Sequence, residues 1–120
     1  MKLVFVELPP FERYRQKHLS DEEYKHFQNE LLENPNKGDL IQGTNGLRKI
    51  RIADMQRNKG KRGGARVIYY HIVNYSKILL VTAYGKDEQS DLSNTERNML
   101  ANKVKRIVEL EIRSCNGKTF

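Results

Sequence analysis

Two apolar stretches separated by a short turn constrain the fold of this chain more than any other feature. Residues 65–73 form an apolar, β-branched and aromatic run, and residues 78–84 contain almost no polar side chain. Between them lies Asn74-Tyr75-Ser76-Lys77, a segment typical of a turn. Because so few of their residues are polar, residues 78–84 are expected to form a buried strand. The two runs therefore predict neighbouring antiparallel strands.

A third strand is expected over residues 47–53, where apolar and polar side chains alternate. Alternation places Ile50 and Ile52 on one face, which is the expected core face. The same alternation puts Lys49 and Arg51 together on the opposite surface. Three consecutive strands with short links predict an antiparallel meander.

Helices are expected on both sides of this meander in the sequence. Residues 1–7 indicate a strand, and two prolines then lead into a helix over residues 11–18. Ser20-Asp21-Glu22-Glu23 is a capping box that predicts a second helix, which ends at Asn34-Pro35. Residues 36–46 are expected to form a loop, and a capping box over residues 93–96 starts a C-terminal helix.

The predicted order is β-α-α-β-β-β-α in a single domain. We expect an α+β fold over residues 1–112, with residues 113–120 as a C-terminal tail. An antiparallel sheet would carry the two N-terminal helices and the C-terminal helix on one face and leave the other face free.

Several kinds of site and location are excluded or disfavoured by the sequence. The chain has one cysteine, Cys115, so neither an internal disulfide nor a multi-cysteine zinc site is expected. Its three histidines show no ligand spacing, and we expect no metal and no cofactor. No apolar run is long enough to span a membrane, and the apolar stretch at the N-terminus is too short for a secretory signal. A soluble, cytoplasmic protein is therefore expected.

The net charge of +7 comes from one segment of the chain. Residues 48–66 contain eight Lys and Arg residues against a single acidic residue, Asp54, while the rest of the sequence is neutral. Such a local excess favours binding to a polyanion, because each neutralised phosphate releases counterions. The alternative is a solvated loop that only keeps the protein soluble.

The basic residues of this meander could support cleavage of RNA. Lys49 and Arg51 lie on one strand, Arg66 opens the next on the same exposed face, and Lys86 follows the last. Attack by a 2′-hydroxyl needs stabilisation of the phosphorane charge, which fixed cations supply. A lysine crowded by other cations can also lose its proton more readily. Tyr84 could provide a phenol or stack on a base, although ordinary strand positions remain the alternative for all of these residues.

Three segments together resemble a known family. They are Gly46-Leu47-Arg48-Lys49-Ile50-Arg51, Lys61-Arg62-Gly63-Gly64-Ala65-Arg66-Val67-Ile68-Tyr69-Tyr70, and the stretch from Leu80 to Leu92 that contains Tyr84-Gly85-Lys86. In order and spacing they resemble the RelE/ParE superfamily of bacterial toxins, and most of all its HigB-type members, over roughly residues 1–110. The resemblance implies a RelE-like fold.

The resemblance also implies an activity and partners. It implies a metal-independent endoribonuclease, an mRNA interferase, that cleaves translated mRNA in the A site of the small ribosomal subunit. A cognate HigA-type antitoxin with a helix-turn-helix domain is the implied protein partner. The implied catalytic residues are Lys49, Arg51, Arg66 and Lys86, and Tyr84 joins them as a candidate from its place at the end of the last strand. The identity of the general base and acid stays open between Lys86 and Tyr84.

A second group of basic residues is expected to dock RNA or the ribosome, because it is dense in charge and has no apolar anchor. It consists of Arg48, Arg57, Lys59, Lys61 and Arg62. Two other functions stay open: a ParE-like toxin that poisons gyrase, and a nucleic-acid-binding module without catalysis.

Overall fold

The computed structural model describes residues 3–53, 64–85, 89 and 91–116 of the chain. Within these ranges the elements follow in this order: β1 (Val4–Glu7), α1 (Pro9–His18), α2 (Asp21–Glu33), β2 (Asp39–Leu40), β3 (Arg48–Ile52), β4 (Ala65–Ile72), the short 3-10 helix η2 (Val73–Tyr75), β5 (Lys77–Gly85) and α3 (Asn94–Asn116). The described strands form one sheet in the order β1-β5-β4-β3-β2. The predicted α+β class is confirmed, and so is the antiparallel meander β3-β4-β5.

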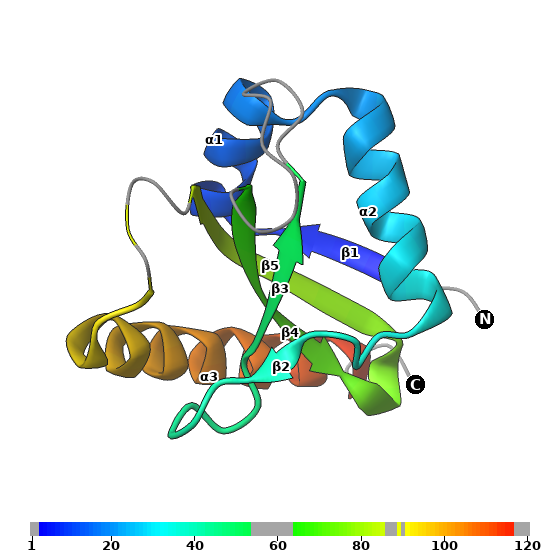
Figure 1. The fold of residues 1–120 in the computed structure, drawn as a ribbon. Helices are drawn as coiled ribbons and strands as arrows, with labels where there is room; N and C mark the ends of the chain where they lie inside the picture. Colours follow the sequence, from blue (N-terminus) through cyan, green and yellow to red (C-terminus); the bar gives the residue numbers. More distant parts are fainter. Residues whose placement is uncertain (1–2, 54–63, 86–88, 90, 117–120) are drawn as a thin grey trace.

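Helices α1 and α2 lie on one face of the sheet and α3 lies on the other (Figure 1). The expectation that all helices share one face and leave the other free is therefore wrong. The physical reason is in β4, where Val67 and Tyr69 face α1 and α2 while Ile68 faces α3. A strand that is apolar on both faces needs a cover on both faces.

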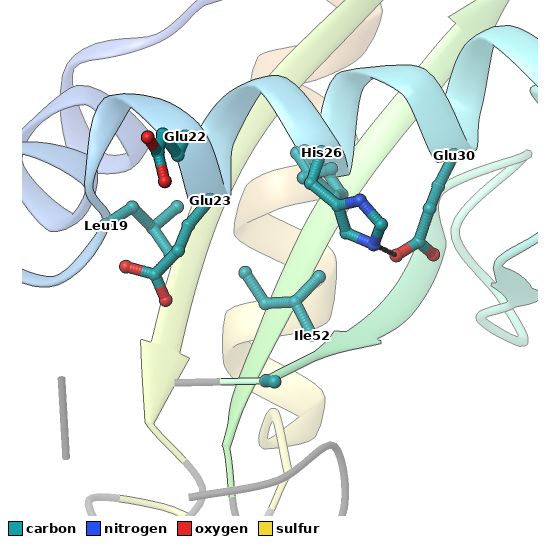
Figure 2. A pocket seen from close by; sticks show the side chains of 8 residues that line it. Leu19, Glu22, Glu23, His26, Glu30 and Ile52 are labelled. Atoms are coloured by element: carbon teal, nitrogen blue, oxygen red, sulfur yellow. Dashed lines mark ion pairs between the residues drawn. The ribbon is translucent and has the colours of Figure 1, made fainter. Parts of the chain in front are cut away.

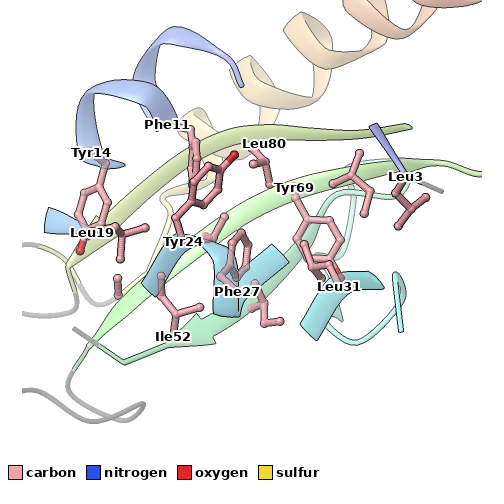
Figure 3. Close-up of a cluster of buried hydrophobic side chains, with 14 residues drawn as sticks. Leu3, Phe11, Tyr14, Leu19, Tyr24, Phe27, Leu31, Ile52, Tyr69 and Leu80 are labelled. Carbon is pink, nitrogen blue, oxygen red and sulfur yellow. The ribbon is translucent and has the colours of Figure 1, made fainter. Parts of the chain in front are cut away.

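The core beneath α1 and α2 is rich in aromatic rings (Figure 3). Phe11 of α1 packs against two rings of α2. Its ring centroid lies 5.8 Å from that of Tyr24 and 6.4 Å from that of Phe27. The predicted capping box starts α2 at the expected place, because the Ser20 hydroxyl and the Glu23 side chain each satisfy the other's backbone N–H. These contacts fix the helical layer against Ile50 and Ile52, which confirms the expected core face of β3.

The second core is built around α3. Val104 is buried, and Leu100, Ile107 and Val108 pack beside it against the strands. The capping box at Ser93 is present as predicted, with reciprocal hydrogen bonds to Glu96. The helix continues to Asn116, so its last residues reach into the segment 113–120 that was expected to be a tail.

Two strands differ from the expected arrangement. The sheet is not wholly antiparallel, because β1 pairs in parallel with β5. Residues 36–46, expected as a loop, contain the short strand β2, which pairs with β3. The chain turns back from β2 to β3 through Gly46. Its φ of +117° is a backbone conformation that residues with a side chain rarely adopt. A Cβ at this position would also lie 3.0 Å from the ring of Tyr70.

Candidate functional site

A row of polar side chains crosses the three central strands on the α3 face. In the strand register Arg51 of β3 lies opposite Arg66 of β4, and Arg66 lies opposite Tyr84 of β5. Directly opposite residues of an antiparallel pair point to the same side of the sheet. Lys49 stands two residues before Arg51 and therefore shares this face. The sheet thus brings together four of the five residues predicted to be catalytic.

An irregularity in β5 decides which way Tyr84 points. Between Ile68 and Tyr69 of β4 the pairing shifts by one residue on β5, so that Val81 is the extra residue. Val81 and Tyr84 both belong to the core on the α3 side, although strict alternation would place them on opposite faces. The bulge therefore turns Tyr84 towards the arginines rather than towards α1 and α2.

Arg66 is buried, with only 4% of its surface exposed. This corrects the expectation that Arg66 lies on an exposed face. Its Nη1 donates a hydrogen bond to the carbonyl oxygen of Ala65 at 3.4 Å. Because like charges placed directly opposite each other destabilise a sheet, the Arg51–Arg66 pair is a costly arrangement for stability alone. Such a local conflict is typical of functional sites.

The hydroxyl of Tyr84 is buried and has no hydrogen-bond partner among the described residues. Burial and the nearby Asp91 carboxylate raise the pKa of Tyr84 to about 12, against the opposing influence of Arg66. At neutral pH the side chain is therefore a phenol that can donate a proton. Its ring lines a pocket of about 310 Å³ between β5 and the start of α3.

Two further residues at this site were not assigned a role from the sequence. Asp91 accepts hydrogen bonds from Lys49 Nζ and from Arg97 Nη2, both at 3.2 Å. Burial alone would raise the pKa of Asp91, but the Leu92 N–H together with Lys49 and Arg97 lowers it below its usual value. The sequence signal for this pair was the capping box at Ser93, which places both residues at the start of α3.

A pocket of about 330 Å³ joins these residues to the edge of the sheet. It lies between the β2 segment, β3 and the beginning of α3. Its charged lining residues are Asp39, Lys49, Arg51, Asp91 and Arg97. The pocket thus brings three cations and two carboxylates to one cavity, and the small excess of positive charge favours an anionic ligand.

The remaining predicted site residues lie elsewhere. Arg48 shares its face of β3 with Ile50, away from Lys49, and its Nη1 donates to the carbonyl oxygens of Asn36 at 3.0 Å and Gly38 at 2.7 Å. The others lie outside the described residues, so their predicted roles stay predictions: Arg57, Lys59, Lys61, Arg62 and Lys86.

The described residues offer neither a metal site nor a membrane-spanning helix. No cluster of three or more His, Cys, Asp or Glu side chains in this part of the chain could hold a metal ion. Among the described helices, none is long and apolar enough to cross a membrane.

A pocket on the opposite side of the molecule has a different chemistry (Figure 2). It measures about 260 Å³ and lies between α2 and the end of β3, with Phe27 and Ile52 in its lining. Its rim carries Glu22, Glu23 and Glu30, and Glu30 lies 3.6 Å from the His26 ring. Because its lining carries three carboxylates and no Lys or Arg side chain, this pocket disfavours a nucleic-acid phosphate.

The fold matches solved structures of small bacterial toxins. A mutant of the E. coli toxin RelE in the free state, with two arginines replaced by alanine, superposes with a TM-score of 0.55 at 18% identity. The match covers 89% of this chain and 99% of that one. The isolated E. coli RelE toxin, in its P21 crystal form, matches with a TM-score of 0.53, also at 18% identity, over 88% of this chain and 99% of the other. The class is thus a RelE-like α+β domain.

The sequence identifies the family. Residues 4–116 match the family described as "RelE toxin of RelE / RelB toxin-antitoxin system". The chain therefore belongs to the RelE toxin family, and this membership implies an antitoxin partner. The superfamily expected from the sequence is confirmed.

Proposed function

We propose that this toxin is a ribosome-dependent endoribonuclease, which cleaves translated mRNA in the A site and thereby inhibits translation. The observation that carries the proposal is the cross-strand row of Arg51, Arg66 and Tyr84, with Lys49 beside it on the same face. Family membership supports a toxin of a toxin–antitoxin system. The row supplies cations for the phosphoryl charge and a phenol for the leaving oxygen, which are two of the three needs of phosphodiester cleavage.

In the proposed reaction the 2′-oxygen of the mRNA attacks the adjacent phosphorus and the bond to the 5′-oxygen breaks. Lys49, Arg51 and Arg66 stabilise the negative charge that develops on the phosphoryl oxygens. Tyr84 donates its phenolic proton to the leaving 5′-oxygen, because its raised pKa keeps that proton in place at neutral pH. The products are a 2′,3′-cyclic phosphate and a free 5′-hydroxyl.

The proton on the 2′-hydroxyl needs an acceptor, and Lys86 is the candidate that the family resemblance supplies. Lys49 and the three residues of the row do not form an efficient acid–base pair by themselves. The ribosome compensates for this in the proposal, because holding the codon in place orients the 2′-hydroxyl for attack. Cleavage should therefore depend on the ribosome, because the toxin supplies the cations and the acid while the ribosome orients the 2′-hydroxyl.

The same proposal covers partners and location. We assign the antitoxin to the HigA type, with a helix-turn-helix domain, on the strength of the HigB-type motifs in the sequence. Arg57, Lys59, Lys61 and Arg62 are proposed to dock the toxin on ribosomal RNA in the cytoplasm. Arg48 belongs to this docking group, although its guanidinium already binds backbone carbonyls.

The test adds the purified toxin to a translating extract and maps cut sites on a reporter mRNA. Wild-type protein should cut within codons, whereas Lys49→Ala and Arg51→Ala should each slow cleavage by about 10²–10³-fold. Lys25→Ala and Arg13→Ala are matched controls, because both residues are exposed on the helices of the opposite face. Both controls should cleave like wild type.

Two results would reject the proposal. One is intact mRNA in translating extract together with inhibition of purified gyrase, which would favour a ParE-like toxin. The other is binding of RNA that weakens with salt but yields no cut product, which would favour a binding module.

A further inference from the structure

The Asp91 carboxylate forms ion pairs with two cations that come from separate elements of the fold. Lys49 belongs to β3 and Arg97 to the first turns of α3, yet their nitrogens lie 3.2 Å from opposite oxygens of one carboxylate. The site as predicted from the sequence includes Lys49 but neither of the other two residues. A bridging anion with two oxygens is also what an RNA phosphate offers.

Arg97 retains unused capacity to bind an anion. Its Nη2 donates to Asp91, but its Nε is buried and has no hydrogen-bond partner among the described residues. Its side chain lines the pocket of about 330 Å³ together with Lys49 and Arg51. A guanidinium can donate two parallel bonds to a phosphate, so Arg97 can hold such a ligand more fully than it holds Asp91.

The Asp91 carboxylate occupies the position between Lys49 and Arg97 that such a phosphate would take. Its Oδ1 accepts a hydrogen bond from the Leu92 N–H at 2.8 Å, which keeps the carboxylate at the start of α3. The exposed fraction of its side chain is 45%, so the carboxylate can turn towards solvent without unpacking the core. Release from Lys49 and Arg97 would therefore disturb little else in the structure.

We propose that Lys49 and Arg97 form a binding subsite for an RNA backbone phosphate, which Asp91 occupies in the free toxin. The phosphate displaces the Asp91 carboxylate on binding, and Arg97 then contacts the RNA directly. This inference rests on the proposed function, since it adds Arg97 to the residues that hold the substrate. Asp91 tunes affinity by competing for the two cations.

The test measures binding of a short 2′-O-methylated RNA, which cannot be cleaved because the attacking oxygen is blocked. Asp91→Asn keeps the acceptor for the Leu92 N–H but removes the competing charge, and it should tighten binding about three- to fivefold, the equivalent of one exposed ion pair. Asp39→Asn is the matched control, because it removes a carboxylate from the same pocket that forms no ion pair within the described residues. Its effect should be clearly smaller.

Arg97→Gln supplies the second arm. It should weaken binding of the RNA and make the slope of log affinity against log salt shallower by about 0.7, the value for one lost phosphate contact on a single strand. In the Arg97→Gln background Asp91→Asn should lose most of its benefit, because the two residues act on one subsite. Inorganic phosphate alone, added as a competitor at millimolar concentration, should bind far more weakly than the RNA.

The outcomes separate this inference from the proposed function. An unchanged salt slope for Arg97→Gln, equal effects of the two aspartate substitutions, or no measurable binding of the RNA by wild type would each overturn the subsite. If free phosphate competes as well as the RNA does, the subsite is a site for the free ion and the assignment to RNA is wrong. If the RNA results hold but wild type leaves mRNA intact during translation, the nuclease is rejected and the subsite stands.

Discussion

Removal of the Tyr84 hydroxyl should make the toxin more stable and less active. The hydroxyl is buried without a hydrogen-bond partner among the described residues, and the residue is only 5% exposed. An unsatisfied buried polar group costs about 1–3 kcal/mol, so Tyr84→Phe should raise the free energy of unfolding by at least about 1 kcal/mol. At this chain length that corresponds to about 4 °C in Tm.

The same substitution should remove the proposed proton donor. General acid catalysis contributes about 10²–10⁴-fold, so cleavage in the translating extract should fall by that factor. Stability is measured by urea unfolding and by thermal melting, and activity by primer extension on the reporter mRNA. The two effects have opposite signs, which ordinary damage to the fold does not produce.

Tyr69 is the matched control for this experiment. Its hydroxyl donates to the Pro35 carbonyl oxygen and accepts from the Gly38 N–H, both at 2.9 Å. Tyr69→Phe leaves both backbone groups without that partner and should lower the free energy of unfolding by about 1–3 kcal/mol. A Tyr84→Phe protein that loses stability as Tyr69→Phe does, or that cleaves mRNA at the wild-type rate, would refute the reasoning.

Three further predictions concern the pH dependence of cleavage, the pH dependence of stability and the N-terminal cap of α3. Because burial raises the pKa of Tyr84 to about 12, the phenol stays protonated in mild alkali, and cleavage should not decline between about pH 7 and 9; a decline there would mean that Tyr84 is not the acid. The raised pKa of Tyr84 also contributes stability to the folded state below about pH 10, and this contribution is lost as the pH rises from 10 towards 12. Over that range the urea midpoint of wild type should therefore fall more steeply than the urea midpoint of Tyr84→Phe. Ser93→Ala removes the side-chain cap of α3 and should lower the free energy of unfolding by about 1 kcal/mol. Thr95→Ala is the control, because Thr95 is exposed in the first turn of the same helix, and it should leave the free energy of unfolding nearly unchanged. Equal melting temperatures for the two variants would contradict the role of the capping box.

Local signals in the sequence were sufficient for most of the elements. Both capping boxes start helices where predicted, because the hydroxyl and the carboxylate that satisfy the free N–H groups lie within four consecutive residues. The alternation in β3 likewise placed Ile50 and Ile52 in the core and Lys49 and Arg51 opposite them. These features depend on residues close in sequence, so no tertiary information was needed.

Two features of the sheet were missed for different reasons. The parallel pairing of β1 with β5 joins segments that are far apart in the sequence. Strand β2 pairs with the nearby β3, but two residues are too few to show a periodic pattern. The face that α3 covers could have been inferred from the apolar residues on both sides of β4, but the antiparallel meander suggested a free face instead.

By itself the sequence determined the toxin family, the order of the main elements and the cations that the site can use. Only the tertiary structure decided that Tyr84 joins the arginines, because a one-residue bulge in β5 sets which face that side chain occupies. Only the tertiary structure brought Asp91 and Arg97 to Lys49, across a separation of more than forty residues. Side-chain periodicity is a local property, whereas the register between strands and the docking of a helix are set by packing of the whole chain.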